Sequence, residues 1–339
     1  MTSCLNRPPA GLQTRSMTDY FRPIPCETGR WQLAGGWVRF SQFELLRRGE
    51  VPRVVDSVPE AVLAALIAPR APLLGLSMDR PRIMGIVNAT PDSFSDGGSY
   101  DGAEQARLLA GQGAEILDIG GESTRPGARE VPVAEEIARV APAIAAARGL
   151  AAVSIDTRKA GVARAAIVAG AGLVNDVSGF DFDPDMAGLV AAAGVPVCLM
   201  HAQGIPETMQ DNPTYGDVLL DVYDALAERI ARAEAAGIPR DRIVIDPGIG
   251  FGKTQAHNLA ILRRISLYHG LGCTVLLGVS RKRFIGSIGG AERPADRVAG
   301  TLALTLAGIA QGIQIHRVHD AAETRQGLAL WRAVTAETR

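Results

Sequence analysis

The hydrophobic pattern changes at Pro81 and keeps its new rhythm to the end of the chain. Short apolar runs bounded by Gly, Asp or Asn alternate there with alanine-rich amphipathic stretches. The runs predict strands at Ile83–Asn88, Ile116–Ile119, Val153–Asp156, Leu173–Asp176, Val195–Met200, Ile243–Asp246, Thr274–Gly278 and Ile313–Val318. The stretches between them predict helices at Gly102–Gly113, Val133–Ala147, Ala160–Val168, Asp185–Ala193, Val218–Ala236, Asn258–Ile265, Arg293–Ala310 and Ala321–Val334.

Eight strand–helix pairs in succession favour an α/β fold of the (β/α)8 type, the TIM barrel, over residues 81–339. A doubly wound parallel sheet is the alternative. The first strand, however, is not followed by the GxGxxG turn with which such sheets bind dinucleotides. The pattern therefore predicts a barrel.

The residues before Pro81 follow a different pattern. Residues 1–16 are polar without periodicity, and we expect a disordered tail. Residues 17–80 carry Trp31 and Trp37, a predicted strand around Gly36–Phe43 and a predicted helix around Pro59–Ala68. They indicate a small N-terminal extension whose fold and role the sequence leaves open.

Composition narrows the class of protein. The chain is 47% hydrophobic and 21% charged, with a net charge of −1, which suits a globular enzyme and gives no reason to expect nucleic acid or a membrane as partner. Its four cysteines are widely spaced, and no apolar run is long enough for a signal peptide or membrane span. We therefore expect a cytoplasmic protein. Among 35 basic residues only Lys159, Lys253 and Lys282 are lysines, so each marks a position that favours a compact ammonium group.

Polar side chains follow almost every predicted strand. In a barrel, functional groups gather at the carboxyl ends of the strands and in the loops that follow. Each residue alone could be a helix cap or turn former, but together they indicate a ligand site. The set comprises Asn88, Asp118, Asp156, Asn175–Asp176, Met200–His201, Asp246, Ser280–Lys282 and Arg317–His319.

Two loops are longer than the usual two to six residues. The loop of residues 88–98 contains Phe94, and that of residues 120–127 contains Thr124 and Arg125, which suit an anion. We interpret both as lids over bound substrate; plain surface loops are the alternative.

The residue types also indicate the class of ligand. Carboxylates and an amide (Asp156, Asn175, Asp246) are expected deep inside the pocket, where they would suit a flat heterocycle with N–H donors. Cations (Arg125, Lys282, Arg317, His319) are expected nearer the mouth, with Arg317 and His319 on one side of the last strand. Together they predict a phosphorylated heterocycle.

Several motifs resemble those of the dihydropteroate synthases, folate-pathway enzymes that sulfonamides target. Residues 83–98 (IMGIVNATPDSFSDGG) and 118–127 (DIGGESTRPG) are similar to the two signatures of that family. The family's further motifs follow in order at residues 154–157, 174–176, 246–253, 278–282 and 317–320. The resemblance covers residues 81 to about 335.

The resemblance implies condensation of 6-hydroxymethyl-7,8-dihydropterin diphosphate with p-aminobenzoate, giving 7,8-dihydropteroate and pyrophosphate. It implies that the pterin is bound by Asp156, Asn175, Met200, Asp246, Lys282 and Arg317. The diphosphate would contact Asn88, Arg317 and His319, with Asn88 also binding Mg²⁺. The p-aminobenzoate site would be shaped by Phe94, Asp96, Thr124, Arg125, Phe251 and Ser280. The catalytic residues would be Asp96, Lys282 and Arg317. A homodimer is also implied, with Arg293–Ala310 as a candidate interface.

Three other functions compete with this one. A pterin-binding methyltransferase barrel would not need the Thr124–Arg125 loop or Ser280–Lys282. A Schiff-base aldolase would need a desolvated lysine inside the barrel, and Lys282 follows its strand end instead. A non-catalytic pterin-binding protein remains open.

Overall fold

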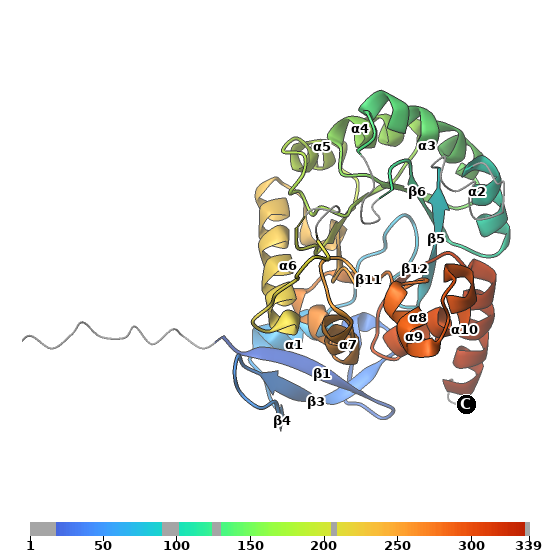
Figure 1. The fold of residues 1–339 in the computed structure, drawn as a ribbon. Coiled ribbons are helices and arrows are strands. Elements are labelled where there is room, and N and C mark those ends of the chain that lie inside the picture. The colour runs from blue at the N-terminus through green and yellow to red at the C-terminus, as the bar shows by residue number, and fades with distance from the viewer. Residues whose placement is uncertain (1–17, 90–101, 124–129, 205–208, 336–339) are drawn as a thin grey trace, which may run out of the picture.

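The computed structural model describes residues 18–89, 102–123, 130–204 and 209–335. Eight parallel strands close into a barrel in the order β10-β11-β12-β5-β6-β7-β8-β9 (Figure 1). They are β5 (Arg82–Asn88), β6 (Ile116–Gly120), β7 (Ala152–Asp156), β8 (Leu173–Asp176), β9 (Val197–Met200), β10 (Ile243–Asp246), β11 (Thr274–Leu277) and β12 (Ile315–Val318). The predicted barrel and each predicted barrel strand are confirmed, with shifts of up to two residues at the ends.

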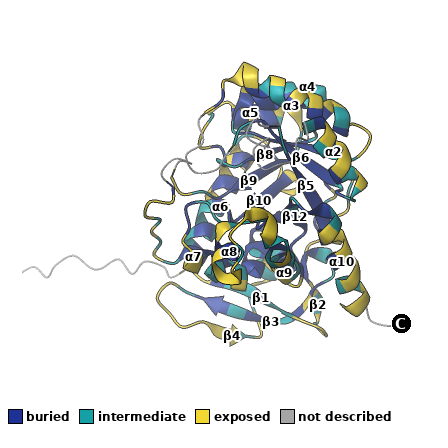
Figure 2. Ribbon diagram, turned by 45° about the vertical axis from the view of Figure 1, so that its right-hand side comes forward, coloured by how far each residue is buried: buried dark blue, intermediate teal, exposed yellow. Residues whose placement is uncertain are grey.

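Helices cover the outside of the barrel, and Figure 2 shows buried strands inside them. The helices are α2 (Gly102–Gly111), α3 (Val133–Ala147), α4 (Ala160–Ala169), α5 (Met186–Ala193), α6 (Val218–Ala235), α7 (Gln255–Arg263), α8 (Arg283–Gly289), α9 (Val298–Ile309) and α10 (Ala321–Thr335). Short 3-10 turns are η3 (Arg240–Arg242), η4 (Ile265–Leu271) and η5 (Pro294–Arg297).

Two predicted helices needed correction, and one observed helix was not predicted. Helix α7 begins at Gln255 because the Thr254 hydroxyl accepts a hydrogen bond from the His257 N–H and caps the helix. The predicted helix Arg293–Ala310 divides into η5 and α9. Helix α8 was not predicted, because its seven residues include two glycines and hide the apolar period.

The N-terminal extension forms an antiparallel sheet in the order β1-β3-β2, with β4 paired to β3. Its elements are β1 (Tyr20–Cys26), β2 (Trp31–Gln32), η1 (Leu33–Gly35), β3 (Arg39–Leu46), β4 (Arg53–Val55) and α1 (Glu60–Ile67). The predicted helix is present, whereas the strand expected at Gly36–Phe43 lies three residues later. Phe40, Phe43 and Leu66 form its own small core.

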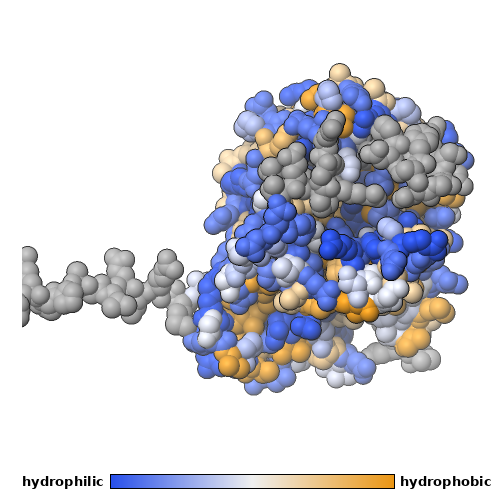
Figure 3. All heavy atoms as spheres, in the orientation of Figure 1, coloured by the Kyte–Doolittle hydropathy of each residue, from blue (hydrophilic) through white to orange (hydrophobic). Residues whose placement is uncertain are grey.

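The sheet is fixed to the barrel by polar contacts. Glu44 on β3 pairs with Arg22 on β1 and with Arg264, which precedes η4. The Tyr20 hydroxyl donates to Asp224 on α6 at 2.9 Å, and the Trp37 indole N–H donates to the Ile309 carbonyl at 2.8 Å. Figure 3 shows hydrophobic residues gathered over the lower part of one face, where this sheet lies in Figure 1.

The segment between the sheet and β5 closes the amino end of the barrel. Leu73 and Met78 are buried and pack with apolar residues from the strands. The strand residues are Met84, Ile116, Leu173, Cys198, Val244, Leu276 and Ile315. With this end filled, the opposite, carboxyl end of the barrel remains for a ligand.

Candidate active site

The strand ends bring most of the predicted site residues together. In the register of the barrel, Asn88 pairs with Gly120, Gly120 with Asp156, and Asp156 with Asn175. Farther round, Met200 pairs with Asp246. Asn88 is half-buried, and the other four site residues are buried: Asp156, Asn175, Met200 and Asp246. Acceptor groups and one thioether therefore line one end of the barrel.

Arg317 contacts two carboxylates at this end of the barrel, and its side chain is 21% exposed. Its Nε donates to Asp118 Oδ2 at 2.6 Å, and its Nη2 donates to Asp156 Oδ2 at 2.6 Å. Asp118 is 0% exposed and also accepts from Ser154 and Asn175. A guanidinium offers several donors in one plane, so it can hold two carboxylates at once. Asp118, which the motif analysis gave no binding role, is therefore central to the site.

Asp156 keeps one carboxylate oxygen free for a ligand. Its Oδ1 is buried and has no hydrogen-bond partner among the described residues, although buried polar atoms are rarely left so. Burial raises the pKa of Asp156 to about 7, against the lowering effect of Arg317 and with a further rise from Asp118. Burial also raises the pKa of Asp246. Asp156 therefore has a buried acceptor to which a ligand could donate.

Lys282 stands beside an aromatic ring at the same end of the barrel. Its Nζ lies 4.0 Å from the centroid of the Phe251 ring, a cation–π distance. Burial lowers the pKa of Lys282 to about 8, while Asp246 opposes that effect. Lys282 and Phe251 therefore form one unit beside Asp246.

Ser280 and His319 are in contact, while Arg317 has other partners. Ser280 Oγ lies 2.9 Å from His319 Nδ1 and accepts a hydrogen bond from the His319 backbone N–H at 3.1 Å. Residues two apart in a strand point to the same side, which is why Arg317 and His319 were expected together. Strand β12 ends at Val318, however, so this rule does not extend to His319. The pair links the loop after β11 to the end of β12.

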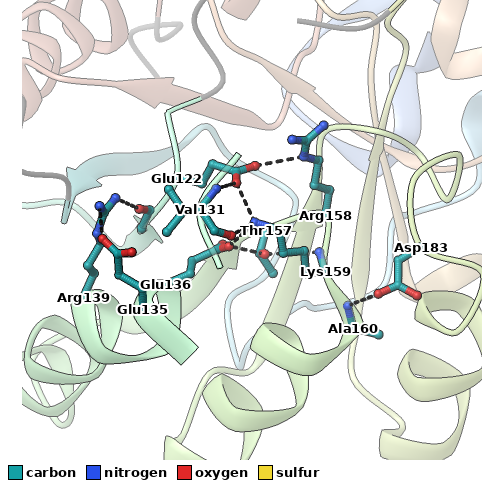
Figure 4. A network of polar contacts seen from close by, with 11 residues as sticks. Glu122, Val131, Glu135, Glu136, Arg139, Thr157, Arg158, Lys159, Ala160 and Asp183 are labelled. Carbon is teal, nitrogen blue, oxygen red and sulfur yellow. Dashed lines mark hydrogen bonds and ion pairs between the residues drawn. The ribbon is translucent and has the colours of Figure 1, made fainter. Parts of the chain in front are cut away.

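A buried ionic cluster joins the start and end of the connection from β6 to α3 (Figure 4). Lys159 Nζ donates to Glu122 at 2.5 Å, to Glu136 at 2.8 Å and to the Val131 carbonyl at 2.6 Å. The Val131 N–H donates back to Glu122 at 2.7 Å. Lys159 is therefore a structural cation that fixes both ends of this connection.

Comparison with known proteins identifies the family. A family model described as pterin binding enzyme matches residues 84–319. Dihydropteroate synthase of Escherichia coli is 43% identical over 264 residues, which cover 76% of this chain and 93% of the relative. The chain belongs to the dihydropteroate synthase family.

Two further similarities agree with this assignment. The solved structure of Xanthomonas albilineans dihydropteroate synthase in complex with 7,8-dihydropteroate is 45% identical, with a TM-score of 0.71, covering 79% of this chain and 99% of that one. A probable bifunctional folylpolyglutamate synthase/dihydropteroate synthase of Haloferax volcanii is 48% identical over 250 residues. These cover 72% of this chain but only 30% of that longer relative. The family resemblance predicted from the motifs is confirmed.

Some predicted site residues lie outside the described residues of this synthase-family chain. They are Phe94, Asp96, Thr124 and Arg125. Much of each predicted lid loop, residues 88–98 and 120–127, also lies outside the described residues, so the lid role stays a prediction. The N-terminal sheet precedes residue 84, where the match to the family model begins.

The motif analysis also missed the buried contacts of Lys253. Its ammonium lies in the turn after β10 and contacts His201, which follows β9. The rarity of lysine in this chain was the signal that could have found these contacts. Where nearly all basic residues are arginines, a lysine indicates a position that favours a compact ammonium group. All three lysines make specific contacts: Lys159 with carboxylates, Lys253 with neutral acceptors and Lys282 with an aromatic ring.

Proposed function

We propose that this protein condenses 6-hydroxymethyl-7,8-dihydropterin diphosphate with p-aminobenzoate, releasing 7,8-dihydropteroate and pyrophosphate. The observation that carries the proposal is the arrangement of Asp156 and Arg317, in which one buried carboxylate oxygen has no donor within the part of the chain that the structure describes. A pterin ring presents N–H donors along one edge and a flat face, which match this oxygen and the guanidinium plane. Family membership supports the same reaction.

The pterin is bound by acceptors on three strands. Asp156, Asn175 and Asp246 accept from its ring and amino N–H groups, and Lys282 donates to its carbonyl and ring nitrogen. Met200 and Arg317 contact its faces. Leaving any of these buried groups unpaired would cost ~1–3 kcal/mol, more for a charged one, so a ring without the donors is rejected.

The diphosphate is bound at the rim by Asn88, Arg317 and His319. Asn88 supplies a carboxamide oxygen at the end of β5, the kind of hard donor that suits Mg²⁺. Within the described ranges, no group of three or more His, Cys, Asp or Glu side chains is arranged to hold a metal ion. That accords with an ion held largely by substrate phosphates, with one or two protein ligands. Mg²⁺ held there would neutralise negative charge on the diphosphate.

The p-aminobenzoate site is formed by Phe251 and Ser280 together with Phe94, Asp96, Thr124 and Arg125, in accordance with the resemblance. Phe251 offers an aromatic face next to Lys282. Ser280 is buried beside His319. Thr124 and Arg125 suit the carboxylate of this substrate.

Catalysis then follows from positioning and charge stabilisation. The C–O bond to the diphosphate breaks, the dihydropterin carries the resulting cation, and the aniline nitrogen forms the new C–N bond before losing a proton to water. Asp96 stabilises the cation. Lys282 holds the pterin carbonyl, and Arg317 contacts both the ring and the departing pyrophosphate.

The assembly and setting of the enzyme are also proposed. Residues 81–339 form the catalytic barrel and residues 17–80 an extension, whereas residues 1–16, expected to be a tail, lie outside the described residues. Helix α9 exposes Ala299, Ala303 and Ala307 at four-residue spacing, which suits close packing against a second copy in a homodimer. Within the described residues, no helix is long and apolar enough to cross a membrane. We propose a cytoplasmic enzyme that sulfonamides inhibit by competing with p-aminobenzoate.

One turnover assay tests the function against its rivals. The purified protein is incubated with dihydropterin diphosphate, p-aminobenzoate and Mg²⁺, and both dihydropteroate and pyrophosphate are measured. Formation of the two products in equal amounts, lost on chelation and restored by Mg²⁺, supports the proposal. Tight pterin binding without turnover would favour a non-catalytic pterin-binding protein.

A further inference from the structure

The side chain of Lys253 is a buried amine surrounded by neutral acceptors, and burial lowers its pKa to about 7. It is 3% exposed. Its Nζ donates to the carbonyl oxygens of Gly248 at 2.9 Å, Phe251 at 3.0 Å and His201 at 3.3 Å. It also lies 2.9 Å from His201 Nδ1. Burying an ammonium is costly unless its donors are satisfied. The set of acceptors around Lys253 therefore indicates that the fold needs a donor group at this position.

The His201 ring is suited to accept from this ammonium. Burial and, to a lesser extent, the charge of Lys253 together lower the pKa of His201 to about 2. The ring is therefore neutral at physiological pH, with Nδ1 as the acceptor and the proton on Nε2. Lys253 thus joins the turn after β10 to the residue that follows β9.

The turn after β10 packs directly against backbone at the end of β9. Gly248 and Gly252 have φ values of +67° and +58°, in the left-handed region that favours glycine. A Cβ on Gly248 would lie 1.9 Å from the His201 carbonyl oxygen, and one on Gly252 would lie 2.5 Å from the Gln203 carbonyl oxygen. With no side chains between the two backbones, the Lys253 ammonium reinforces the direct hydrogen bond from the His201 N–H to the Asp246 carbonyl at 2.9 Å.

The same turn connects two parts of the active site. Asp246 Oδ1 accepts from the Gly248 N–H at 2.7 Å, and the Gly248 carbonyl accepts from Lys253. Lys253 also binds the carbonyl of Phe251, whose ring lies 4.0 Å from the Lys282 ammonium. The ammonium therefore fixes the backbone between a pterin-binding carboxylate and the aromatic face proposed for p-aminobenzoate.

We propose that Lys253 is a positioning residue for the p-aminobenzoate site: its ammonium holds the turn of residues 246–253 so that the Phe251 ring stays beside Lys282. This inference rests on the proposed function, because Phe251 is assigned to p-aminobenzoate there. Lys253 itself contacts backbone carbonyls and His201, so its effect on substrate passes through Phe251.

The test compares Lys253→Met with Phe251→Leu and with the double variant in steady-state turnover. For Lys253→Met we expect the KM for p-aminobenzoate to rise about tenfold, while kcat and the KM for the pterin diphosphate change less than about threefold. Adding Lys253→Met to Phe251→Leu should raise the KM for p-aminobenzoate by less than about twofold more, because the ring that Lys253 positions is already gone. Tyr215→Phe is the matched control. It removes a different hydrogen bond to the same turn, that of the Tyr215 hydroxyl to the Gly252 carbonyl at 2.7 Å, and should leave this KM within about twofold.

Three outcomes would overturn the inference. They are a KM for p-aminobenzoate in Lys253→Met within twofold of the parent, effects of the two single substitutions that simply multiply in the double variant, or an equal rise for Tyr215→Phe. If Lys253→Met does not fold, as judged by circular dichroism, Lys253→Gln serves in its place, because its amide keeps two donors but not the charge. Failure of the proposed function is distinct, since the unsubstituted protein would then form no dihydropteroate.

Discussion

The Nη2 atom of Arg317 lies 2.6 Å from Asp156 Oδ2, and Nε of the same guanidinium lies 2.6 Å from Asp118 Oδ2. One cation on β12 thus holds carboxylates on β6 and β7. The carboxylates raise the pKa of the guanidinium against the effect of burial, so Arg317 remains charged at any pH that the enzyme meets. Its position next to Asp156 is consistent with the proposed role of Arg317 at both the pterin and the diphosphate.

Replacing Arg317 should therefore affect both stability and binding. In Arg317→Met two buried carboxylates lose their cation, and breaking a buried pair in this way costs about 3–5 kcal/mol. Denaturant unfolding measures the loss. Adding Asp118→Asn should recover part of it, because one of the uncompensated charges is removed. A single variant as stable as the parent would contradict a shared ion pair.

Pterin affinity should depend on pH through Asp156. Its pKa of about 7 in the free protein means that the carboxyl holds a proton below that pH. A pterin that donates hydrogen bonds to the carboxylate favours the deprotonated form, so binding releases a proton and affinity rises with pH. Between pH 6 and pH 8 the gain should be about tenfold, since each pH unit below the pKa costs a factor of ten.

Calorimetry with the unphosphorylated pterin alcohol measures this effect, because that ligand carries no titrating phosphate. Proton release is checked by repeating the titration in buffers of different ionisation enthalpy. Asp156→Asn is the control and should show weak binding that no longer changes over this range. The same pH dependence in the variant would assign the titration to another group.

Asp246→Asn should weaken pterin binding without unfolding the turn. The asparagine oxygen can still accept from the Gly248 N–H, which Asp246 does at 2.7 Å. Its NH₂ group, however, would face the donors of the pterin, and mispaired buried groups cost ~1–3 kcal/mol or more. Calorimetry with the pterin diphosphate should show at least about tenfold weaker binding. Unchanged affinity would remove Asp246 from the pterin site.

Met78→Ala should lower stability while leaving the chemistry unchanged. Met78 is 1% exposed and packs with strand residues at the amino end of the barrel, opposite the site. Truncation of a buried methionine to alanine costs about 2–5 kcal/mol. Thermal unfolding reports the loss, and kcat/KM below the transition should stay within about twofold of the parent. A large loss of activity in the folded variant would mean that this segment influences the site.

The sequence by itself determined the barrel and the end of it that carries the site. Alternating apolar runs and amphipathic stretches are local signals. A run such as Leu173–Asp176 predicts a buried strand from its own residues alone. Because all strands in this fold point the same way, polar residues such as Asp156 and Asp246 at their carboxyl ends had to meet. The motifs around Asn88 and Asp118 also indicated the family, which the comparisons confirm.

The tertiary structure decided which of these groups pair. That Arg317 reaches Asp118, 199 residues earlier in the chain, depends on the closure of the barrel between β12 and β5. Likewise, strands β1, β2 and β4 of the extension are short or weakly alternating, and they form because β3 and the barrel surface offer partners. The link between Lys253 and His201 arises from glycines that let two backbones meet. Strand periodicity is encoded by neighbouring residues, whereas these contacts join residues far apart in the chain, so only the folded molecule specifies them.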